Sequence, residues 1–322
     1  MSATRRNRPA DPSATVTMVS LVDDQHRPEQ DRCTTPDGLG IAVYDFGGRG
    51  PDLLLAHATG FCAEVFSPLA GALGDRHHCW GLDLRGHGRS DRPLDGDFAW
   101  SGFATDVLAA IGHLGLRRPA AFGHSCGGAS ALLAEEVAPG TFSSLYCFEP
   151  VVFPEPAGGI GTALADDNPL SNGARRRRDT FPSAEDAFVN FASKPPFSDL
   201  DPEVLRCYVE AGFEPVPAAD GGDGRSIRLL CQREDEAEIY ARGSAHGAFG
   251  HLHEIGCHVT LGCGEVTDAF GLPFLDADAA QLRHATVEVI PGIGHFGPLQ
   301  RPDLVAAAVA AAFDAVDDTP PA

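Results

Sequence analysis

Apolar and polar positions along most of this chain alternate between two patterns. Short, continuous apolar runs such as DLLLAH and AAFGH are typical of strands buried on both faces of a parallel sheet, and segments with helical spacing separate them. The expected strands are 52–57, 77–83, 120–124 and 143–149, and the expected helices between them are 63–73, 101–115 and 126–137. This order predicts an α/β fold with a mostly parallel, doubly wound sheet and helices on both of its faces.

The same alternation extends to both ends of the folded part. Residues 31–47 read as two short strands joined by a Pro-Asp-Gly turn. Near the C-terminus, the pattern predicts strands at 257–264 and 286–290 and helices at 276–283 and 303–316.

Between Pro150 and the strand near 257 this rhythm stops. About a hundred residues there combine chain breakers, such as FPEPAGGIG and KPPFSD, with helical stretches such as AEDAFVNFA and PEVLRCYVEAGF. Because a compact domain rarely contains a structureless loop of that length, we expect a helical lid over 151–255. Residues 30–150 and 256–322 would then form the core, and 1–29 a disordered tail.

Composition and charge exclude several classes of function. The chain has 322 residues, 43% of them apolar, and no apolar run near 18 residues, so we expect no membrane association. A formal net charge of -21 makes nucleic acid an improbable partner. Nine cysteines without a C-x-x-C pair favour reduced thiols in a cytoplasmic protein over disulfides or structural zinc. Composition leaves open whether the chain is a monomer or a homodimer.

The segment AAFGHSCGGAS at 120–130 carries the clearest candidate chemistry. Gly123, Ser125 and Gly127 form a G-x-S-x-G pattern where an expected strand meets an expected helix. Such a turn lifts the serine hydroxyl above the sheet edge and leaves no room for side chains two residues before and after it. We therefore expect Ser125 to be a nucleophile and the backbone N–H of Cys126 to face the reacting group.

Three further segments support acyl-transfer chemistry. HATGF (57–61) follows a strand at the place where a second oxyanion donor is needed, and the N–H of Thr59 is the candidate. PGIGHFG places His295 in a glycine-flanked loop after the last strand, where a general base could reach Ser125. GCGEVTDAF supplies carboxylates after the strand that follows the lid.

With these motifs in this order, the chain from about residue 31 onward resembles the α/β-hydrolase superfamily, in its lid-bearing, small-molecule serine hydrolase branch. The segment LDLRGHGRSDRP (82–93) also resembles that branch. The resemblance implies a serine hydrolase that needs no cofactor and cleaves an ester, lactone or thioester of a small, largely apolar molecule. A C–C bond hydrolase and a receptor-like member with little turnover remain alternatives.

The acid of the expected triad has three candidates. Asp268 stands four residues beyond Gly264, follows a hydroxyl residue and has a short side chain suited to a sheltered contact with His295, so it is the preferred choice. Glu149 ends an earlier strand, at a position that some relatives use. Glu265 directly follows Gly264 and would leave the strand too early to reach the histidine.

The pocket and metal expectations rest on residue type alone. The residues expected to line the substrate pocket are His57, Phe61, Phe153, Phe249 and Phe296. The four consecutive arginines at 175–178 would point around a helix, so we expect a solvated surface there. The HLHEIGCH segment at 251–258 lacks convincing ligand geometry, and no metal is expected.

Overall fold

The computed structural model describes residues 28–154, 168–217 and 225–317, and its centre is a mixed sheet with the strand order β1-β2-β4-β3-β5-β6-β10-β11. The first two strands run antiparallel to their neighbours, and the pairs from β4 to β11 are parallel. The strands are β1 (Glu29–Thr34), β2 (Gly40–Gly48), β3 (Asp52–Ala56), β4 (His78–Leu82), β5 (Ala120–His124), β6 (Ser144–Phe148), β10 (His258–Gly264) and β11 (Ala285–Ile290). The predicted α/β fold is confirmed.

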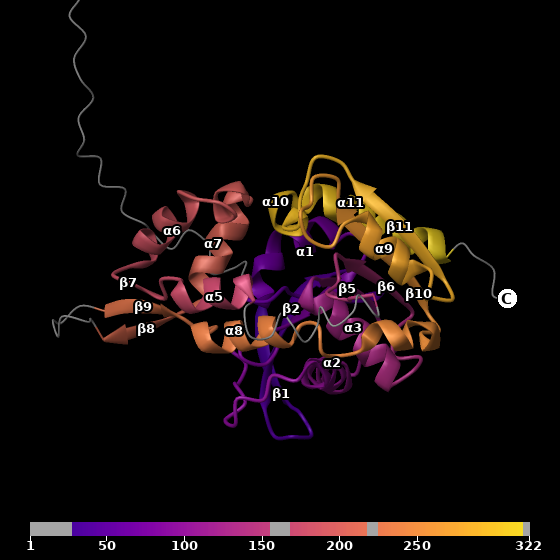
Figure 1. Ribbon diagram of the computed structural model, residues 1–322, viewed down its shortest axis with the longest axis horizontal. Coiled ribbons are helices and arrows are strands. Elements are labelled where there is room, and N and C mark those ends of the chain that lie inside the picture. The colour runs from indigo at the N-terminus through magenta and orange to yellow at the C-terminus, as the bar shows by residue number, and fades with distance from the viewer. Residues whose placement is uncertain (1–27, 155–167, 218–224, 318–322) are drawn as a thin grey trace, which may run out of the picture.

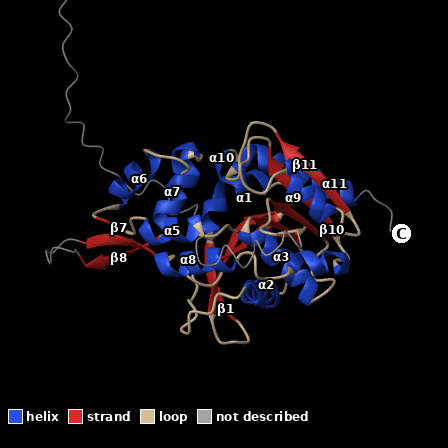
Figure 2. Ribbon diagram, viewed as in Figure 1, coloured by secondary structure: helices blue, strands red, loops and turns tan. Residues whose placement is uncertain are grey.

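Helices cover both faces of this sheet (Figures 1 and 2). One face packs against α2, α3 and α9, and the other packs against α1 and α11, each through a cluster of buried apolar side chains. The core helices are η2 (Ala63–Phe66), α1 (Ser67–Leu73), α2 (Trp100–Leu114), α3 (Cys126–Val137), α9 (Leu272–Ala279), α10 (Gly297–Gln300) and α11 (Pro302–Asp317). Burial on both faces explains why the parallel strands read as continuous apolar runs.

The chain between β6 and β10 is here called the inserted segment. Its elements from α5 to β9 lie to one side of the core (Figure 1, left), whereas its last element, η4, packs against the core helix α3. Its elements are α5 (Pro169–Arg176), β7 (Thr180–Phe181), α6 (Ala184–Ala192), η3 (Phe197–Asp199), α7 (Pro202–Ala211), β8 (Phe213–Pro217), β9 (Arg225–Leu229), α8 (Arg233–Arg242) and η4 (Ala248–Glu254). The two helices expected at AEDAFVNFA and PEVLRCYVEAGF are present as α6 and α7. A three-stranded antiparallel sheet, in the order β7-β9-β8, was not expected.

Two predicted boundaries need correction. Strand β1 begins at Glu29, inside the expected tail, whereas residues 1–27 lie outside the described residues. Helix α9 begins at Leu272 rather than 276, because Pro273 occupies its first turn, where a missing N–H costs no hydrogen bond. The division of the chain into core and lid at 151 and 255 remains a prediction.

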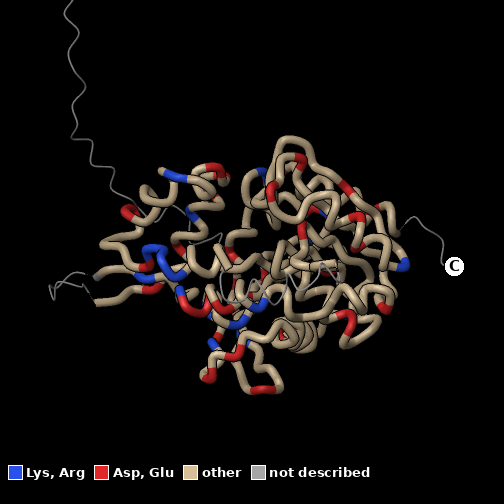
Figure 3. The backbone as a smooth tube through the Cα atoms, in the orientation of Figure 1, with Lys and Arg blue, Asp and Glu red and all other residues tan. Residues whose placement is uncertain are grey.

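Basic residues, acidic residues and cysteines are distributed differently over the structure. Basic residues gather mainly on the inserted segment and the nearby core loops, whereas acidic residues are spread over the whole molecule (Figure 3). All nine cysteines are buried, and none is in a disulfide in the described residues. Among the helices of the described segments, none combines the length and the apolar character needed to cross a bilayer.

Candidate active site

Ser125 lies in a strained turn between β5 and α3. Its backbone angles are φ 54° and ψ -112°, which side-chain-bearing residues rarely adopt. A Cβ on Gly127 would stand 2.1 Å from the carbonyl oxygen of Ala56, and one on Gly123 would stand 2.5 Å from the Cα of Gly128. The glycines at both positions are therefore required by close backbone contacts, as the G-x-S-x-G pattern predicts.

The loop after β3 is held by two buried histidines. Nδ1 of His57 donates to the carbonyl of Ala58 (2.8 Å), and its Nε2 accepts from the backbone N–H of Leu84 (3.0 Å). The N–H of Gly60 donates to Nε2 of His87 (3.0 Å). Burial lowers the pKa of His57 to about 4 and that of His87 to about 3, so both rings are neutral at pH 7.

These contacts correct one pocket assignment. His57 is fully buried, and both of its ring nitrogens are engaged by the backbone, so it supports the loop instead of lining a pocket. Thr59 and Cys126 are both buried, and a hydrogen bond joins their side chains. Burial, the largest influence, raises the pKa of the Cys126 thiol to about 12, which keeps it protonated. Thr59 and Cys126, whose backbone N–H groups are the expected oxyanion donors, therefore lie next to each other.

His295 is paired with Glu149, and the prediction of Asp268 as its partner is wrong. Nδ1 of His295 donates to Oε2 of Glu149 at 2.7 Å. Glu149 has no solvent exposure and also accepts from the N–H of Gly264 (3.0 Å) and the hydroxyl of Thr267 (2.8 Å). With Nδ1 protonated and bonded to the carboxylate, Nε2 is left as the proton acceptor.

The sheet order explains why Glu149, and neither Asp268 nor Glu265, contacts His295. It directly follows β6, which lies between β5 and β10, and its φ of 45° turns the chain at the strand end. Asp268 is exposed, beyond the hydroxyl of Thr267 that bonds Glu149. Glu265 is exposed as well and accepts from the N–H of Gly292 (3.0 Å).

Hydrogen bonds to backbone carbonyls connect the segments that carry Ser125, Glu149 and His295. The N–H of Ser125 donates to the carbonyl of Phe148 (2.9 Å), the residue before Glu149. His124, the residue before Ser125, donates from Nε2 to the carbonyl of His295 (2.9 Å). Within the described residues, no hydrogen bond joins Ser125 Oγ to His295 Nε2, and such contacts commonly tighten only when substrate binds.

Two chains of aromatic contacts reach His295. The ring centroid of Phe296 lies 5.2 Å from that of His295 and 5.8 Å from that of Phe61, which in turn contacts Phe197 and Tyr208 of the inserted segment. The ring centroid of Phe270 lies 6.3 Å from that of His295 and 5.4 Å from that of Phe153.

Of the four expected pocket phenylalanines, Phe296 contacts His295 directly, and Phe61 and Phe153 are each one ring further away. Phe249 lies on η4 instead, where it packs against the core cluster of α2 and α3.

Arg177 is the one of the four consecutive arginines that turns inward, which residue type alone did not indicate. The other three are exposed, whereas the Arg177 side chain is 17% exposed, is paired with Glu236 and bonds the hydroxyl of Tyr208 (2.6 Å). A Cβ on Gly60 would stand 2.8 Å from Oε1 of Glu236. The inserted segment thus places a buried ion pair directly against the loop that carries Thr59.

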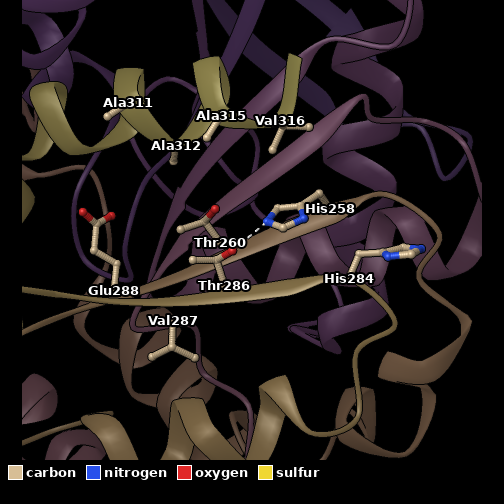
Figure 4. Close-up of a pocket in the computed structure, with 10 residues that line it drawn as sticks. All are labelled: His258, Thr260, His284, Thr286, Val287, Glu288, Ala311, Ala312, Ala315 and Val316. Atoms are coloured by element: carbon tan, nitrogen blue, oxygen red, sulfur yellow. Dashed lines mark hydrogen bonds between the residues drawn. The ribbon is translucent and has the colours of Figure 1, made fainter. Parts of the chain in front are cut away.

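A separate groove lies between α11 and the first residues of β10 and β11, with polar side chains from the strands and apolar side chains from α11. It has a volume of about 690 Å³, and its polar lining includes His258, Thr260 and Thr286, with His258 Nε2 bonded to Thr286 Oγ1 at 3.0 Å (Figure 4). His258 begins β10, whereas Ser125 follows the C-terminal end of the parallel strand β5, so this groove is apart from the candidate active site. The described residues contain no group of three or more His, Cys, Asp or Glu side chains arranged to hold a metal ion.

The chain is similar to several known proteins. The chain is 26% identical over 271 residues to a 2-(acetamidomethylene)succinate hydrolase of Mesorhizobium japonicum, which covers 83% of this chain and 90% of that one. It is 37% identical over 121 residues to a pimeloyl-[acyl-carrier protein] methyl ester esterase of Methylococcus capsulatus, over 37% of this chain and 44% of the relative.

Solved structures share the fold. An E-2-(acetamidomethylene)succinate hydrolase superposes with a TM-score of 0.73 at 23% identity, over 89% of this chain and 99% of the other. A thermophilic esterase from Thermogutta terrifontis superposes with a TM-score of 0.67 at 19% identity, also over 89% and 99%. The model of the alpha/beta hydrolase family matches residues 53–308, which include Ser125, Glu149 and His295, and the chain belongs to that family.

Proposed function

We propose that this protein is a serine hydrolase that cleaves an ester, lactone or thioester of a small, largely apolar molecule with a Ser125–His295–Glu149 triad. The observation that carries the proposal is the hydrogen bond between His295 Nδ1 and the fully buried Glu149, formed beside a strained serine elbow. A carboxylate in that position fixes the tautomer in which Nε2 can accept a proton from the serine.

In the proposed reaction, Oγ of Ser125 attacks the substrate carbonyl while Nε2 of His295 takes its proton. The backbone N–H groups of Thr59 and Cys126 stabilise the oxyanion that forms. The bond to the leaving group then breaks, and His295 returns the proton to the departing atom. Water attacks the acyl-enzyme by the same route in reverse, which releases the acid and restores Ser125.

The aromatic surroundings support a largely apolar substrate. Phe270 and Phe296 contact His295, Phe153 and Phe61 contact those two rings, and such rings favour apolar groups over strongly hydrated ones. The curated relative from Mesorhizobium is named for 2-(acetamidomethylene)succinate. We therefore include that compound beside short-chain aryl esters in a first substrate panel.

A fluorophosphonate probe tests the proposal together with that panel. The wild-type protein should become labelled and turn over at least one ester, because an activated serine reacts irreversibly with the probe. Ser125→Ala should abolish both, whereas Ser143→Ala, which removes an exposed hydroxyl elsewhere, is the matched control. Ester turnover that survives Ser125→Ala would refute the mechanism, and labelling without any turnover would favour a receptor-like role.

A further inference from the structure

The loop after β3, which carries Thr59, is held from two directions at Gly60. From the core, Nε2 of His87 accepts a hydrogen bond from the N–H of Gly60 (3.0 Å). From the inserted segment, the carboxylate of Glu236 lies against Gly60, where an added Cβ would stand 2.8 Å from Oε1. The φ of Gly60 is 83°, which side-chain-bearing residues rarely adopt. The core and the inserted segment therefore fix this glycine together.

Arg177 connects Glu236 to a second contact with the same loop. Its guanidinium is paired with Glu236 and donates to the hydroxyl of Tyr208 (2.6 Å). The ring of Tyr208 packs against Phe61, the residue after Gly60, with 5.3 Å between the ring centroids. The side chains of Arg177 and Glu236 are 17% and 7% exposed, so water competes little for these bonds. One guanidinium thus holds two side chains that touch the loop.

Helix α8, which carries Glu236, is itself fixed to the core. Asp235, the preceding residue, is paired with Arg92 of a core loop at 2.5 Å, and its side chain is only 4% exposed. Further along the helix, the indole N–H of Trp100 on α2 donates to the carbonyl of Ile239 (3.3 Å). The carboxylate of Glu236 therefore meets the loop from a helix that the core holds in place.

The loop also touches the serine turn. The side chain of Thr59 is hydrogen-bonded to that of Cys126, and a Cβ on Gly127 would stand 2.8 Å from the carbonyl oxygen of His57. In the proposed reaction, the N–H of Thr59 stabilises the oxyanion. Because Thr59 and Gly60 share a peptide bond, a shift of Gly60 moves this donor, and a displacement of about 1 Å can slow a reaction by about 10²-fold.

We propose that Arg177 is a positioning residue for the oxyanion site, because it holds the loop that carries Thr59. It acts through Glu236, which contacts Gly60, and through Tyr208, which contacts the next residue. The inference rests on the proposed hydrolase function. It gives the inserted segment a part in catalysis that does not require contact with the substrate.

Replacing Arg177 tests the inference through the oxyanion that the reaction forms. Arg177→Met should lower kcat by about 10- to 100-fold and leave KM within about twofold, because the oxyanion forms during the reaction and is absent from the bound ester. The inhibition constant of a trifluoromethyl ketone, whose adduct with Ser125 carries an equivalent oxyanion, should rise in proportion. Arg176→Met is the matched control, because it makes the same change at the exposed neighbour and should retain wild-type kcat.

Two further variants separate positioning from stability. Combining Arg177→Met with Glu236→Met removes both buried charges and should recover most of the stability lost in the single variant, measured by chemical denaturation. Its kcat should stay low, because the methionines cannot reproduce the polar contacts with Gly60 and Tyr208. Tyr208→Phe keeps the ion pair and the ring but loses the bond to Arg177, so kcat should fall by about 2- to 10-fold at unchanged KM.

Three outcomes would overturn the inference. If kcat of the double variant returns to the wild-type value together with its stability, the ion pair only supports the fold. A higher KM at unchanged kcat would mean that Arg177 contacts the substrate, and an equal loss of kcat in Arg176→Met would mean that the effect is not specific to Arg177. These results would leave the hydrolase function intact. If the wild type hydrolyses no member of the first panel, the proposed function fails, and this inference fails with it.

Discussion

Replacing Glu149 with glutamine tests the proposed triad most directly, because it keeps the size of the side chain and removes its charge. Oε1 can still accept from the N–H of Gly264, now 3.0 Å away, and the new amide can donate to the hydroxyl of Thr267. The amide cannot accept from Nδ1 of His295. The ring is then expected to adopt the other tautomer, with its proton on Nε2, where it can no longer accept one from Ser125.

The expected loss follows from that change of tautomer. In a well-studied serine protease triad, the corresponding acid-to-amide change lowers kcat by about 10⁴ while the geometry stays intact. We expect a decrease of 10³- to 10⁴-fold for Glu149→Gln. Because two of the three hydrogen bonds can be kept, the free energy of unfolding should fall by only about 1–2 kcal/mol.

Steady-state kinetics and thermal unfolding of three variants provide the assay. Glu265→Gln is the matched control, since it makes the same chemical change at an exposed position, and it should retain near-wild-type kcat. Asp268→Asn should change kcat by less than about tenfold. A near-normal rate for Glu149→Gln, or a collapse for Asp268→Asn with an intact fold, would refute the assignment of Glu149.

Three further changes test the surroundings of the site. Burial raises the pKa of Asp278 to about 8, so the folded protein keeps a proton that the unfolded chain loses near pH 4. The free energy of unfolding should therefore fall by on the order of 5 kcal/mol between pH 4 and 8. An unchanged dependence of this free energy on pH in Asp278→Asn would contradict the prediction. Arg177→Met leaves Glu236 buried without its partner and should cost about 3 kcal/mol in chemical denaturation, most of it recovered when both become Met. Gly127→Ala forces a methyl group against the carbonyl oxygen of Ala56. The variant should lose about 1–3 kcal/mol of stability and should not be labelled by the probe. A stable, fully labelled variant would show that the turn at Ser125 is not tightly packed.

Most of the core could be predicted from the sequence because its signals are local. Strands buried on both faces appear as continuous apolar runs. The serine turn is recognisable from its glycines, because a Cβ on Gly127 would stand 2.1 Å from the carbonyl oxygen of Ala56. His295 was identifiable because it stands in a glycine-flanked loop after the last strand. The strands, the serine turn and the histidine loop each depend on residues that are close together in the sequence, so they can be predicted from it.

The acid and the inserted segment depend on contacts between distant parts of the chain. Spacing after β10 favoured Asp268, yet the donors that surround Glu149 come from Gly264, Thr267 and His295, which only the strand order brings together. In the inserted segment, β7 has two residues and β8 carries two prolines, so neither shows the alternation of an ordinary strand. Likewise, nothing in the sequence distinguishes Arg177, which turns inward, from the other three arginines of the run.

The positions of the three proposed catalytic residues along the chain have a consequence for how activity arises during folding. Ser125 and Glu149 follow adjacent strands and are linked through the carbonyl of Phe148, so they can be assembled as soon as β5 and β6 pair. The bond from Glu149 to His295 spans 146 positions and needs β10 and β11 in place. A nascent chain that has emerged only through the inserted segment can therefore hold a serine elbow with its acid nearby but no base, which would keep the nucleophile inactive until the last strand docks.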